Sequence, residues 1–104
     1  MSRRRDAIPT LSSKERLILE LLVGREELYG LQLVDSSRRR LKRGTVYVTL
    51  ARMEDKGYVI SRREDPPPDA GGLPRRLYAP TALGRTVLGA WTAMARRLVP
   101  EFAR

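Results

Sequence analysis

The sequence contains no cysteine and no histidine. Disulfides, thiolate nucleophiles and histidine-centred catalysis are therefore excluded, and a zinc site would have to be built from carboxylates alone. No apolar run reaches membrane-spanning length or resembles the core of a signal peptide. Neither type of Gly-rich nucleotide-binding loop is present. We therefore expect no enzyme activity, no cofactor, no metal and no membrane partner.

Acidic residues are in the minority. The 104 residues include 21 Lys plus Arg against 12 Asp plus Glu, which gives a net charge of +9. Eighteen of the 21 basic residues are arginine, whose planar guanidinium favours bidentate contact with phosphate. This balance indicates a polyanionic partner but does not choose between DNA, RNA and an anionic membrane surface. The length fits one domain, and its small core favours sharing apolar surface with a second copy.

Residues 42–57 predict an amphipathic helix. Val46, Leu50 and Met53 recur at i, i+4 and i+7 and form one apolar stripe. Five of the six residues 38–43 are basic, and the helix dipole adds about half a positive charge at the same end. The residues expected to project away from the stripe are Thr45, Tyr47, Thr49, Arg52 and Lys56. Such a helix suits recognition of an anionic polymer, although an ordinary surface helix also has a polar outer face.

Two helices are predicted before it. Residues 12–23 form the first, opened by a capping box of Ser12 and Glu15 and stopped by Gly24. Its apolar face is expected to include Leu17, Ile18, Leu21 and Leu22. Residues 28–37 form a shorter second helix with Leu28, Leu31 and Val34 inward. Gly30 costs this helix about 1 kcal/mol relative to alanine, which suggests close packing against a neighbouring helix.

After Gly57, which suits the helix C-terminus, the pattern changes to strands. Residues 58–63 and 76–78 are rich in β-branched and aromatic side chains. Between them, residues 64–74 hold four prolines, two glycines and three acidic residues, so we predict a long-looped hairpin, or wing, at about 58–79. Arg62, Arg63, Arg75 and Arg76 flank the loop as candidate phosphate contacts, with a solvated charged hairpin as the alternative.

The C-terminal region predicts a last helix from the N-cap Thr81 to about residue 99, ended by Pro100. Its apolar residues Val87, Trp91, Met94 and Leu98 are spaced by four, three and four, a short heptad seam. We expect this helix to pack on its own domain and on a second copy, with Phe102 as a further contact. At the other end, residues 1–9 with Arg3–Arg5 are predicted to form a flexible basic arm, which either touches phosphate or is uninvolved.

Three segments resemble the PadR-like family of transcriptional regulators. Residues 17–22 followed by Tyr29-Gly30-Leu31-Gln32-Leu33 resemble its first helix and the (H/Y)GYEL start of its second. Residues 44–59 resemble its most distinctive segment, GTxYxxLxxLExxGLI, and residues 75–78 with 81–84 resemble RRxYxLTxxG. Together they cover about residues 11–88. Val48 departs from the pattern, which usually has proline there, and the single C-terminal helix is similar to the family's shorter branch.

The resemblance implies a mainly α fold with a small β-hairpin. It comprises a winged helix-turn-helix domain over residues 10–80 and a C-terminal dimerisation helix and tail over residues 81–104. It also implies a dimeric repressor with the third helix in the major groove of double-stranded DNA. The predicted DNA-binding residues are Lys42, Arg43, Thr45, Tyr47, Thr49, Arg52, Arg75 and Arg76. The predicted dimer residues are Val87, Trp91, Met94 and Leu98.

The sequence therefore predicts a cytoplasmic, nucleoid-associated homodimeric repressor that binds a pseudo-palindromic operator. Arg43 or Arg52 is expected to reach a guanine, and Thr45 or Thr49 a thymine methyl group. Trp91 and Met94 could line a pocket for a small apolar or aromatic effector that releases the repressor from DNA. The alternative, which we favour, is that they only pack against the second copy in the dimer. The alternatives are a winged-helix module that docks an acidic protein, and an RNA or non-specific nucleic-acid binder. A preferred DNA sequence distinguishes the repressor from both.

Overall fold

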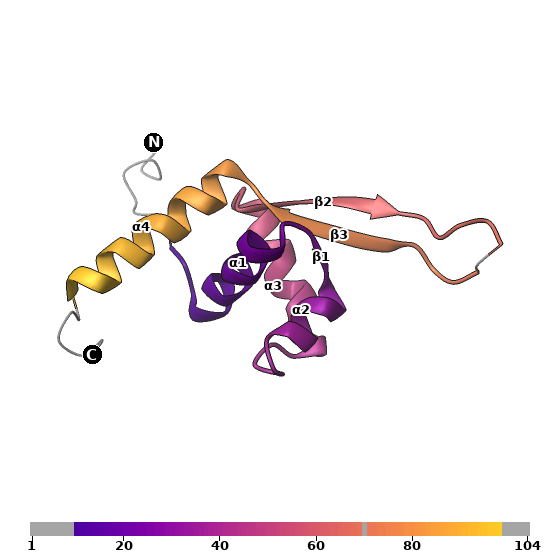
Figure 1. The fold of residues 1–104 in the computed structure, drawn as a ribbon, viewed down its shortest axis with the longest axis horizontal. Helices are drawn as coiled ribbons and strands as arrows, with labels where there is room; N and C mark the ends of the chain where they lie inside the picture. Colours follow the sequence, from indigo (N-terminus) through magenta and orange to yellow (C-terminus); the bar gives the residue numbers. More distant parts are fainter. Residues whose placement is uncertain (1–9, 70, 99–104) are drawn as a thin grey trace.

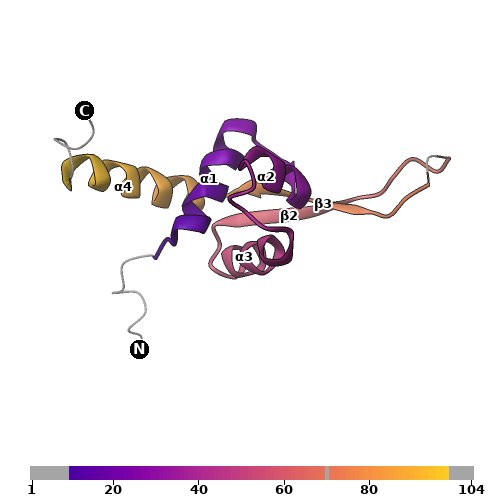
Figure 2. The same ribbon diagram turned by 90° about the horizontal axis from the view of Figure 1, so that it is seen from below.

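The computed structural model describes residues 10–69 and 71–98 (Figure 1). The elements are, in order, α1 (Ser13–Arg25), β1 (Leu28–Tyr29), α2 (Gly30–Ser36), α3 (Arg43–Asp55), β2 (Val59–Glu64), β3 (Arg75–Pro80) and α4 (Ala82–Leu98). Helices α1, α2 and α3 gather into a small bundle. The β2–β3 hairpin extends from one side of this bundle and α4 from the other (Figures 1 and 2). The predicted mainly α fold with a small hairpin is confirmed.

The first helix begins as predicted. The Ser12 hydroxyl accepts from the Glu15 N–H at 3.1 Å, and the Glu15 carboxylate accepts from the Ser12 N–H at 2.8 Å, so the capping box is complete. The prediction that Gly24 stops this helix is wrong, because α1 continues to Arg25 and its C-cap is Glu26, which has a φ of 77°. A glycine weakens a helix by about 1 kcal/mol without having to end it.

The second helix starts later than predicted because its first residues belong to the sheet. Leu28 and Tyr29 pair antiparallel with Tyr78 and Leu77, which gives a three-stranded sheet in the order β1-β3-β2. With α2 beginning at Gly30, its buried positions are Gly30, Leu33 and Val34. The prediction that Leu31 points inward is therefore wrong, and its side chain is 45% exposed.

One apolar core joins the helices to the base of the sheet. The predicted stripe of α3 is confirmed, with Val46, Leu50 and Met53 at most 1% exposed. Its partners are the buried residues Ile18, Leu19, Leu22, Leu28, Leu33, Val34, Leu41, Tyr58, Val59, Tyr78 and Val87. The chain leaves α3 through Gly57 at a φ of 83°, a left-handed position that glycine adopts without steric cost. This turn sends β2 directly out of the core as the first strand of the wing.

The last helix divides into an anchored and an exposed part. Thr81 is its N-cap, as predicted, because its hydroxyl accepts from the Gly84 N–H at 2.9 Å. Val87 is buried, and the Trp91 indole N–H donates to the Leu11 carbonyl at 3.4 Å. Further along α4, Met94 and Leu98 are 49% and 71% exposed. The predicted seam is thus split, and only its second half is free for a partner.

The predicted basic arm, the end of the last helix at residue 99 and Phe102 lie outside the described residues. Within the described ranges, no helix is long and apolar enough to cross a bilayer.

Candidate nucleic-acid interface

The turn between α2 and α3 exposes a run of arginines. The Ser37 hydroxyl, which is buried, donates to the Val34 carbonyl at 2.7 Å and accepts from the Leu41 N–H at 2.9 Å. The Leu41 side chain is only 1% exposed. Between these two anchors, Arg38 and Arg39 have left-handed φ angles of 56° and 68°. Because both ends of the turn are held in the core, its charged side chains point to solvent.

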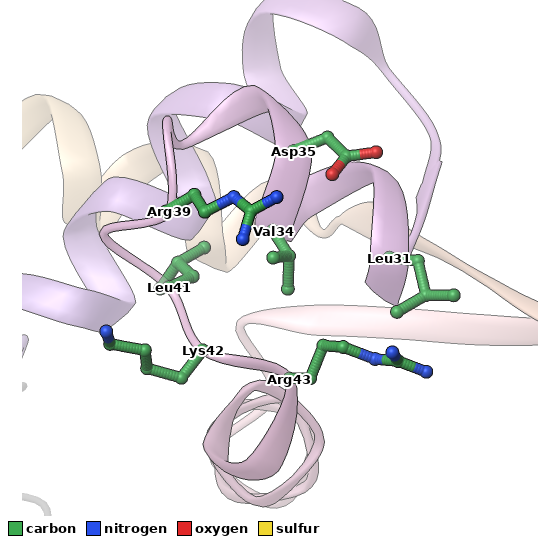
Figure 3. A pocket seen from close by; sticks show the side chains of 7 residues that line it. All are labelled: Leu31, Val34, Asp35, Arg39, Leu41, Lys42 and Arg43. Atoms are coloured by element: carbon green, nitrogen blue, oxygen red, sulfur yellow. The ribbon is translucent and has the colours of Figure 1, made fainter.

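The turn leads into the N-terminus of α3, beside a hollow between α2 and α3 (Figure 3). Arg39, Lys42 and Arg43 surround this hollow together with the apolar Leu31, and Asp35 is the acidic group on its edge. Lys42 is the N-cap of α3 and makes no side-chain capping hydrogen bond. The exposed end of α3 therefore combines free backbone N–H groups with fixed positive charge, which favours an anion there.

The outer face of α3 carries most of the residues predicted to face a partner. Thr45, Tyr47 and Arg52 are exposed. The Tyr47 ring lies over Gly30 of α2, where an added Cβ would come within 2.5 Å of the ring, so the close packing predicted for this glycine is confirmed. Val48, which the sequence singled out only as a departure from the PadR-like pattern, is 58% exposed.

Thr49 does not share this outer face. Thr49 is only 7% exposed, and its hydroxyl donates to the Thr45 carbonyl one turn earlier at 3.1 Å. The expectation that Thr49 projects outward is therefore wrong. A threonine in a helix often satisfies its hydroxyl on the preceding turn in this way, so Thr49 can be buried without leaving its hydroxyl unpaired.

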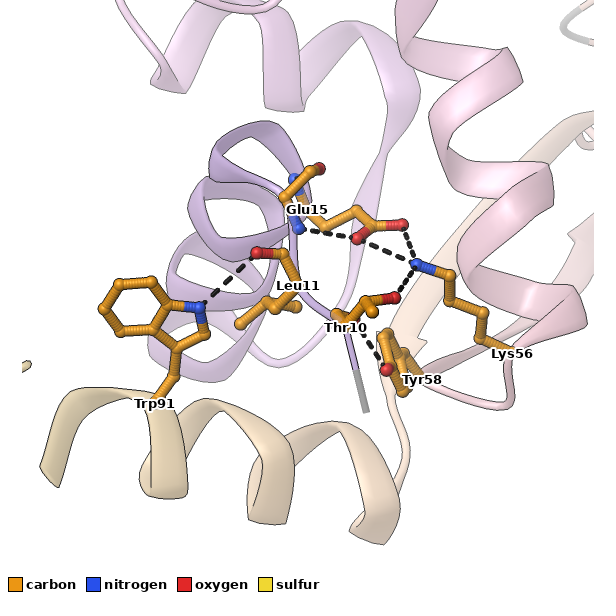
Figure 4. A network of polar contacts seen from close by, with 7 residues as sticks. Thr10, Leu11, Glu15, Lys56, Tyr58 and Trp91 are labelled. Carbon is orange, nitrogen blue, oxygen red and sulfur yellow. Dashed lines mark hydrogen bonds and ion pairs between the residues drawn. The ribbon is translucent and has the colours of Figure 1, made fainter. Parts of the chain in front are cut away.

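Lys56 is not a free outward cation either (Figure 4). Its ammonium donates to both carboxylate oxygens of Glu15, at 2.9 and 3.1 Å, and to the Thr10 hydroxyl at 3.2 Å. Burial raises the pKa of Glu15, but hydrogen bonds from Ser12 and Lys56 and the charge of Lys56 outweigh it, so this pKa lies below its usual value. The Glu15–Lys56 pair thus connects the start of α1 to the end of α3.

Glu54, near the C-terminal end of α3, contacts the wing. Its carboxylate accepts from the Ser61 hydroxyl at 2.8 Å. This contact joins α3 to the base of the wing.

One face of the wing contacts the segment that precedes α2. Arg62 makes two hydrogen bonds to Glu27, at 2.8 and 3.0 Å, which lower the pKa of that carboxyl. The Tyr29 hydroxyl donates to Glu64, and this bond raises the pKa of the phenol. Arg75 lies 4.6 Å from the centre of the Tyr29 ring. These contacts join the hairpin to the segment before α2. Arg62 is paired with a carboxylate, whereas Arg75 stacks on the neutral Tyr29 ring and keeps its positive charge.

The other face of the wing is turned toward α3. Arg76 lies directly opposite Arg63 in the strand pairing, and Arg63 is bound to Asp65 at 2.9 Å. The Arg76 guanidinium donates to the Ser61 hydroxyl at 3.0 Å, next to Glu54 of α3. Within the described residues, Arg76 has no carboxylate partner in an ion pair. Of the four wing arginines, Arg76 is therefore the best placed to act together with α3.

A second hollow connects these two parts. It lies between α2, α3 and β3 and is lined by Tyr29, Gly30, Leu31, Gln32, Asp35, Tyr47, Pro74, Arg75, Arg76 and Tyr78. The structure therefore exposes seven of the eight residues predicted to bind DNA, on α3 and its N-terminus and on the two faces of β3, and buries Thr49.

Of the residues predicted to form a dimer or effector contact, Val87 and Trp91 are occupied by their own domain. The Arg16 guanidinium lies 5.3 Å from the Trp91 ring centre, and the indole N–H is bound to Leu11 (Figure 4). Met94 and Leu98 alone of the four are exposed.

Comparison with known proteins agrees with this architecture. The sequence model described as the transcriptional regulator PadR-like family matches residues 18–90. A PadR family transcription regulator from hypervirulent Clostridium difficile R20291 is 28% identical, with a TM-score of 0.66 over 84% of this chain and 90% of that chain. A PadR family regulator from Eggerthella lenta is also 28% identical, with a TM-score of 0.66 over 86% of this chain and 80% of that chain. A PadR-like transcription factor from Bacteroides fragilis is 25% identical, with a TM-score of 0.69 over 82% of this chain and 82% of that chain. No curated protein matches the chain.

Proposed function

This chain belongs to the PadR-like family of transcriptional regulators, and we propose that it represses transcription as a homodimer bound to a pseudo-palindromic operator. Membership makes it a DNA-binding regulator and not an enzyme. The observation that carries the proposal is the exposed outer face of α3, bounded by the cationic turn at its N-terminus and by Arg76 of the wing. An amphipathic helix presented in this way has the width and charge that the major groove accepts.

The proposed contacts fall into two kinds. Lys42 and Arg43, at the N-terminus of α3, contact phosphates, as do Arg75 and Arg76 of the wing. Thr45, Tyr47 and Arg52 face base edges, where the guanidinium of Arg52 can make two hydrogen bonds to a guanine. Thr49 has no place in this set because it is buried.

Phosphate contacts make the affinity depend on salt. Each neutralised phosphate contributes about 0.9 to the slope of log affinity against log salt concentration, so the four basic residues named predict a slope of about −3 to −4 per subunit. The test is to select duplexes from a random pool with the full chain, and then to titrate the recovered sequence over a range of salt concentrations. Equal affinity for any duplex sequence would refute sequence-specific repression.

The second copy is proposed to cover the exposed half of α4. Met94 and Leu98 are apolar, exposed and one helical turn apart, and two such helices packed together would present two α3 helices to half-sites about 34 Å apart. Replacing both residues by glutamate is expected to yield a monomer in sedimentation equilibrium. Ala93→Glu, at an exposed position about 120° around α4 from Met94 and Leu98, is the matched control and is expected to remain dimeric. An unchanged mass for the double variant would exclude this interface.

Repression also requires that operator binding blocks transcription. A reporter placed downstream of the selected operator is expected to lose expression when the chain is produced, and Arg52→Ala is expected to restore it. Increased reporter expression would identify an activator instead. Effector release stays a prediction, tested by whether ligands alter the fluorescence of Trp91.

A further inference from the structure

The outer face of α3 carries a valine, Val48, that does not belong to the apolar core of the described residues. Val48 is 58% exposed, whereas the remaining valine of this helix, Val46, is 1% exposed. We propose that Val48 reads the methyl group of a thymine in the major groove, which makes it a base-specificity residue of this chain. This inference deepens the operator recognition proposed above and rests on it.

The helical geometry aims Val48 away from the domain. The buried residues of α3 are Val46, Thr49, Leu50 and Met53. At about 100° per residue, Val48 points roughly 150° away from their mean direction. Its neighbours along the outer line of the helix, at i−4 and i+3, are Gly44 and Ala51, which are both exposed. Both of these neighbours are shorter than Val48, and the longer Arg52 and Asp55 lie one and two turns toward the C-terminus.

The surroundings of Val48 favour DNA as that surface. Arg52 is its i+4 neighbour and Thr45 its i−3 neighbour, both exposed, and Lys42 and Arg43 lie at the N-terminal end of the same helix. An anionic groove is attracted by these charges and brought against the outer line of α3. The charges alone do not distinguish one base pair from another, because phosphates are the same at every position.

The chemistry of valine then selects the base. Val48 has neither a hydrogen-bond donor nor an acceptor, so it gains only from covering apolar surface. In the major groove, thymine alone among the four unmodified bases presents a methyl group, whereas cytosine has only a hydrogen at the same C5 position beside its polar amino group and the purine edges present N7 and a polar exocyclic group. A polar edge covered by Val48 would lose water without receiving a new hydrogen bond. Thymine is therefore the favoured base opposite Val48, and Ala51 is too short to replace it.

The experiment uses the full chain and the operator recovered by selection. Each thymine is replaced in turn by uracil, which removes the methyl group and keeps every hydrogen-bonding atom, and the dissociation constant is measured at constant salt. The wild-type chain is expected to lose about fourfold in affinity at one thymine of each half-site, which corresponds to one methyl group withdrawn from an apolar contact. Replacing the same thymine–adenine pair by cytosine–guanine is also expected to weaken binding. Replacing it by 5-methylcytosine–guanine is expected to restore part of that loss in affinity.

Val48→Ala is the test variant. Alanine has the higher helix propensity and Val48 makes no core contact, so this variant is expected to fold normally. It is expected to bind the thymine and uracil operators with equal affinity at that position. Ile60→Ala is the matched control: Ile60 is 60% exposed on β2, but it alternates with the buried Val59 and so faces away from the core and α3. This control is expected to keep the wild-type preference for thymine.

The inference is overturned if the recovered operator contains no thymine whose uracil effect differs between wild type and Val48→Ala. In that outcome the operator itself still supports the proposed function. A selection that recovers no preferred sequence would overturn the proposed function and the role of Val48 together.

Discussion

Replacing Lys56 by methionine removes one partner of the ion pair that connects α1 to α3. The Glu15 side chain is 1% exposed and that of Lys56 29% exposed. With Lys56 gone, the carboxylate remains buried and, among the described residues, keeps only the hydrogen bond that it accepts from the Ser12 N–H. We therefore expect Lys56→Met to lower the free energy of unfolding markedly while leaving the secondary structure intact.

The magnitude follows from the burial of the pair. Removing one partner of a fully buried ion pair costs about 3–5 kcal/mol. Because Lys56 is partly exposed and Ser12 still binds Glu15, we expect about 2–3 kcal/mol, below that range. For a domain of this size each kcal/mol shifts the melting temperature by about 4–8 °C, so a decrease of roughly 10–20 °C is expected.

A second substitution should partly reverse this loss. In Glu15→Gln/Lys56→Met, the buried charge is gone and the amide oxygen can still accept from the Ser12 N–H. Replacing both partners of a buried pair by neutral groups is often close to neutral. The double variant is therefore expected to be more stable than Lys56→Met alone, as measured by urea denaturation at one protein concentration.

The effect of pH has a defined sign. The pKa of Glu15 is lowered in the folded chain, so its contribution to stability is fully present above the unfolded pKa of about 4.3 and is lost as the pH falls through the folded pKa. The stability difference between wild type and Lys56→Met is expected to shrink as the pH is lowered from 7 to 3.

The control is the exposed pair Arg16–Glu20, whose side chains are 41% and 47% exposed. Glu20→Gln is expected to change the free energy of unfolding by about 0.5 kcal/mol or less. The reasoning would be refuted if Lys56→Met were as mild as this control, or if adding Glu15→Gln made Lys56→Met less stable.

Two further predictions concern packing and DNA contact. Gly84→Ala places a Cβ 2.2 Å from the backbone oxygen of Tyr58 and is expected to destabilise the fold by about 1–3 kcal/mol or more. Gly89→Ala, whose added Cβ would have no atom within 4 Å, is expected to be neutral or stabilising in urea denaturation. Similar denaturation midpoints for both variants would contradict the close approach of α4 to the base of the wing. Arg76→Ala is expected to weaken binding to all duplexes and to reduce the salt slope by about 1, while Arg62→Ala, whose guanidinium is held by Glu27, is expected to leave the slope unchanged in anisotropy titrations. Equal slopes for both arginine variants would remove Arg76 from the proposed interface.

Much of the fold was predictable because its signals are local. Ser12 with Glu15, Thr81 with Gly84 and Gly57 at the end of α3 act within a few residues of sequence, so their types and spacing are sufficient evidence. The stripe of α3 was predictable for the same reason. The start of α2 could not be predicted, because Leu28 and Tyr29 pair with residues about 50 positions later. A two-residue strand leaves no periodic pattern in the sequence.

The candidate site was predictable in outline and not in detail. The sequence placed basic and hydroxyl residues on one helix, and the exposed Lys42, Arg43 and Arg52 agree with that. Thr49 lies three residues after Val46 and four before Met53, at the edge of the apolar stripe, whereas Thr45 lies about 40° further around the helix. The packing of α3 on the rest of the domain decides that the nearer of the two is buried.

Residues near one another in the chain were enough to predict the four helices, the hairpin, the N-caps Ser12 and Thr81, the positive charge and the likeness to the PadR-like family. The tertiary structure alone decided which charges are free. Lys56 is bound by Glu15 and Arg62 by Glu27, whereas Arg76 has no such partner in the described part of the chain. These partners lie 41 and 35 residues apart, and an ion pair depends on distance in space, which no local pattern records. The same packing leaves Val48 as the exposed apolar side chain on the outer face of α3.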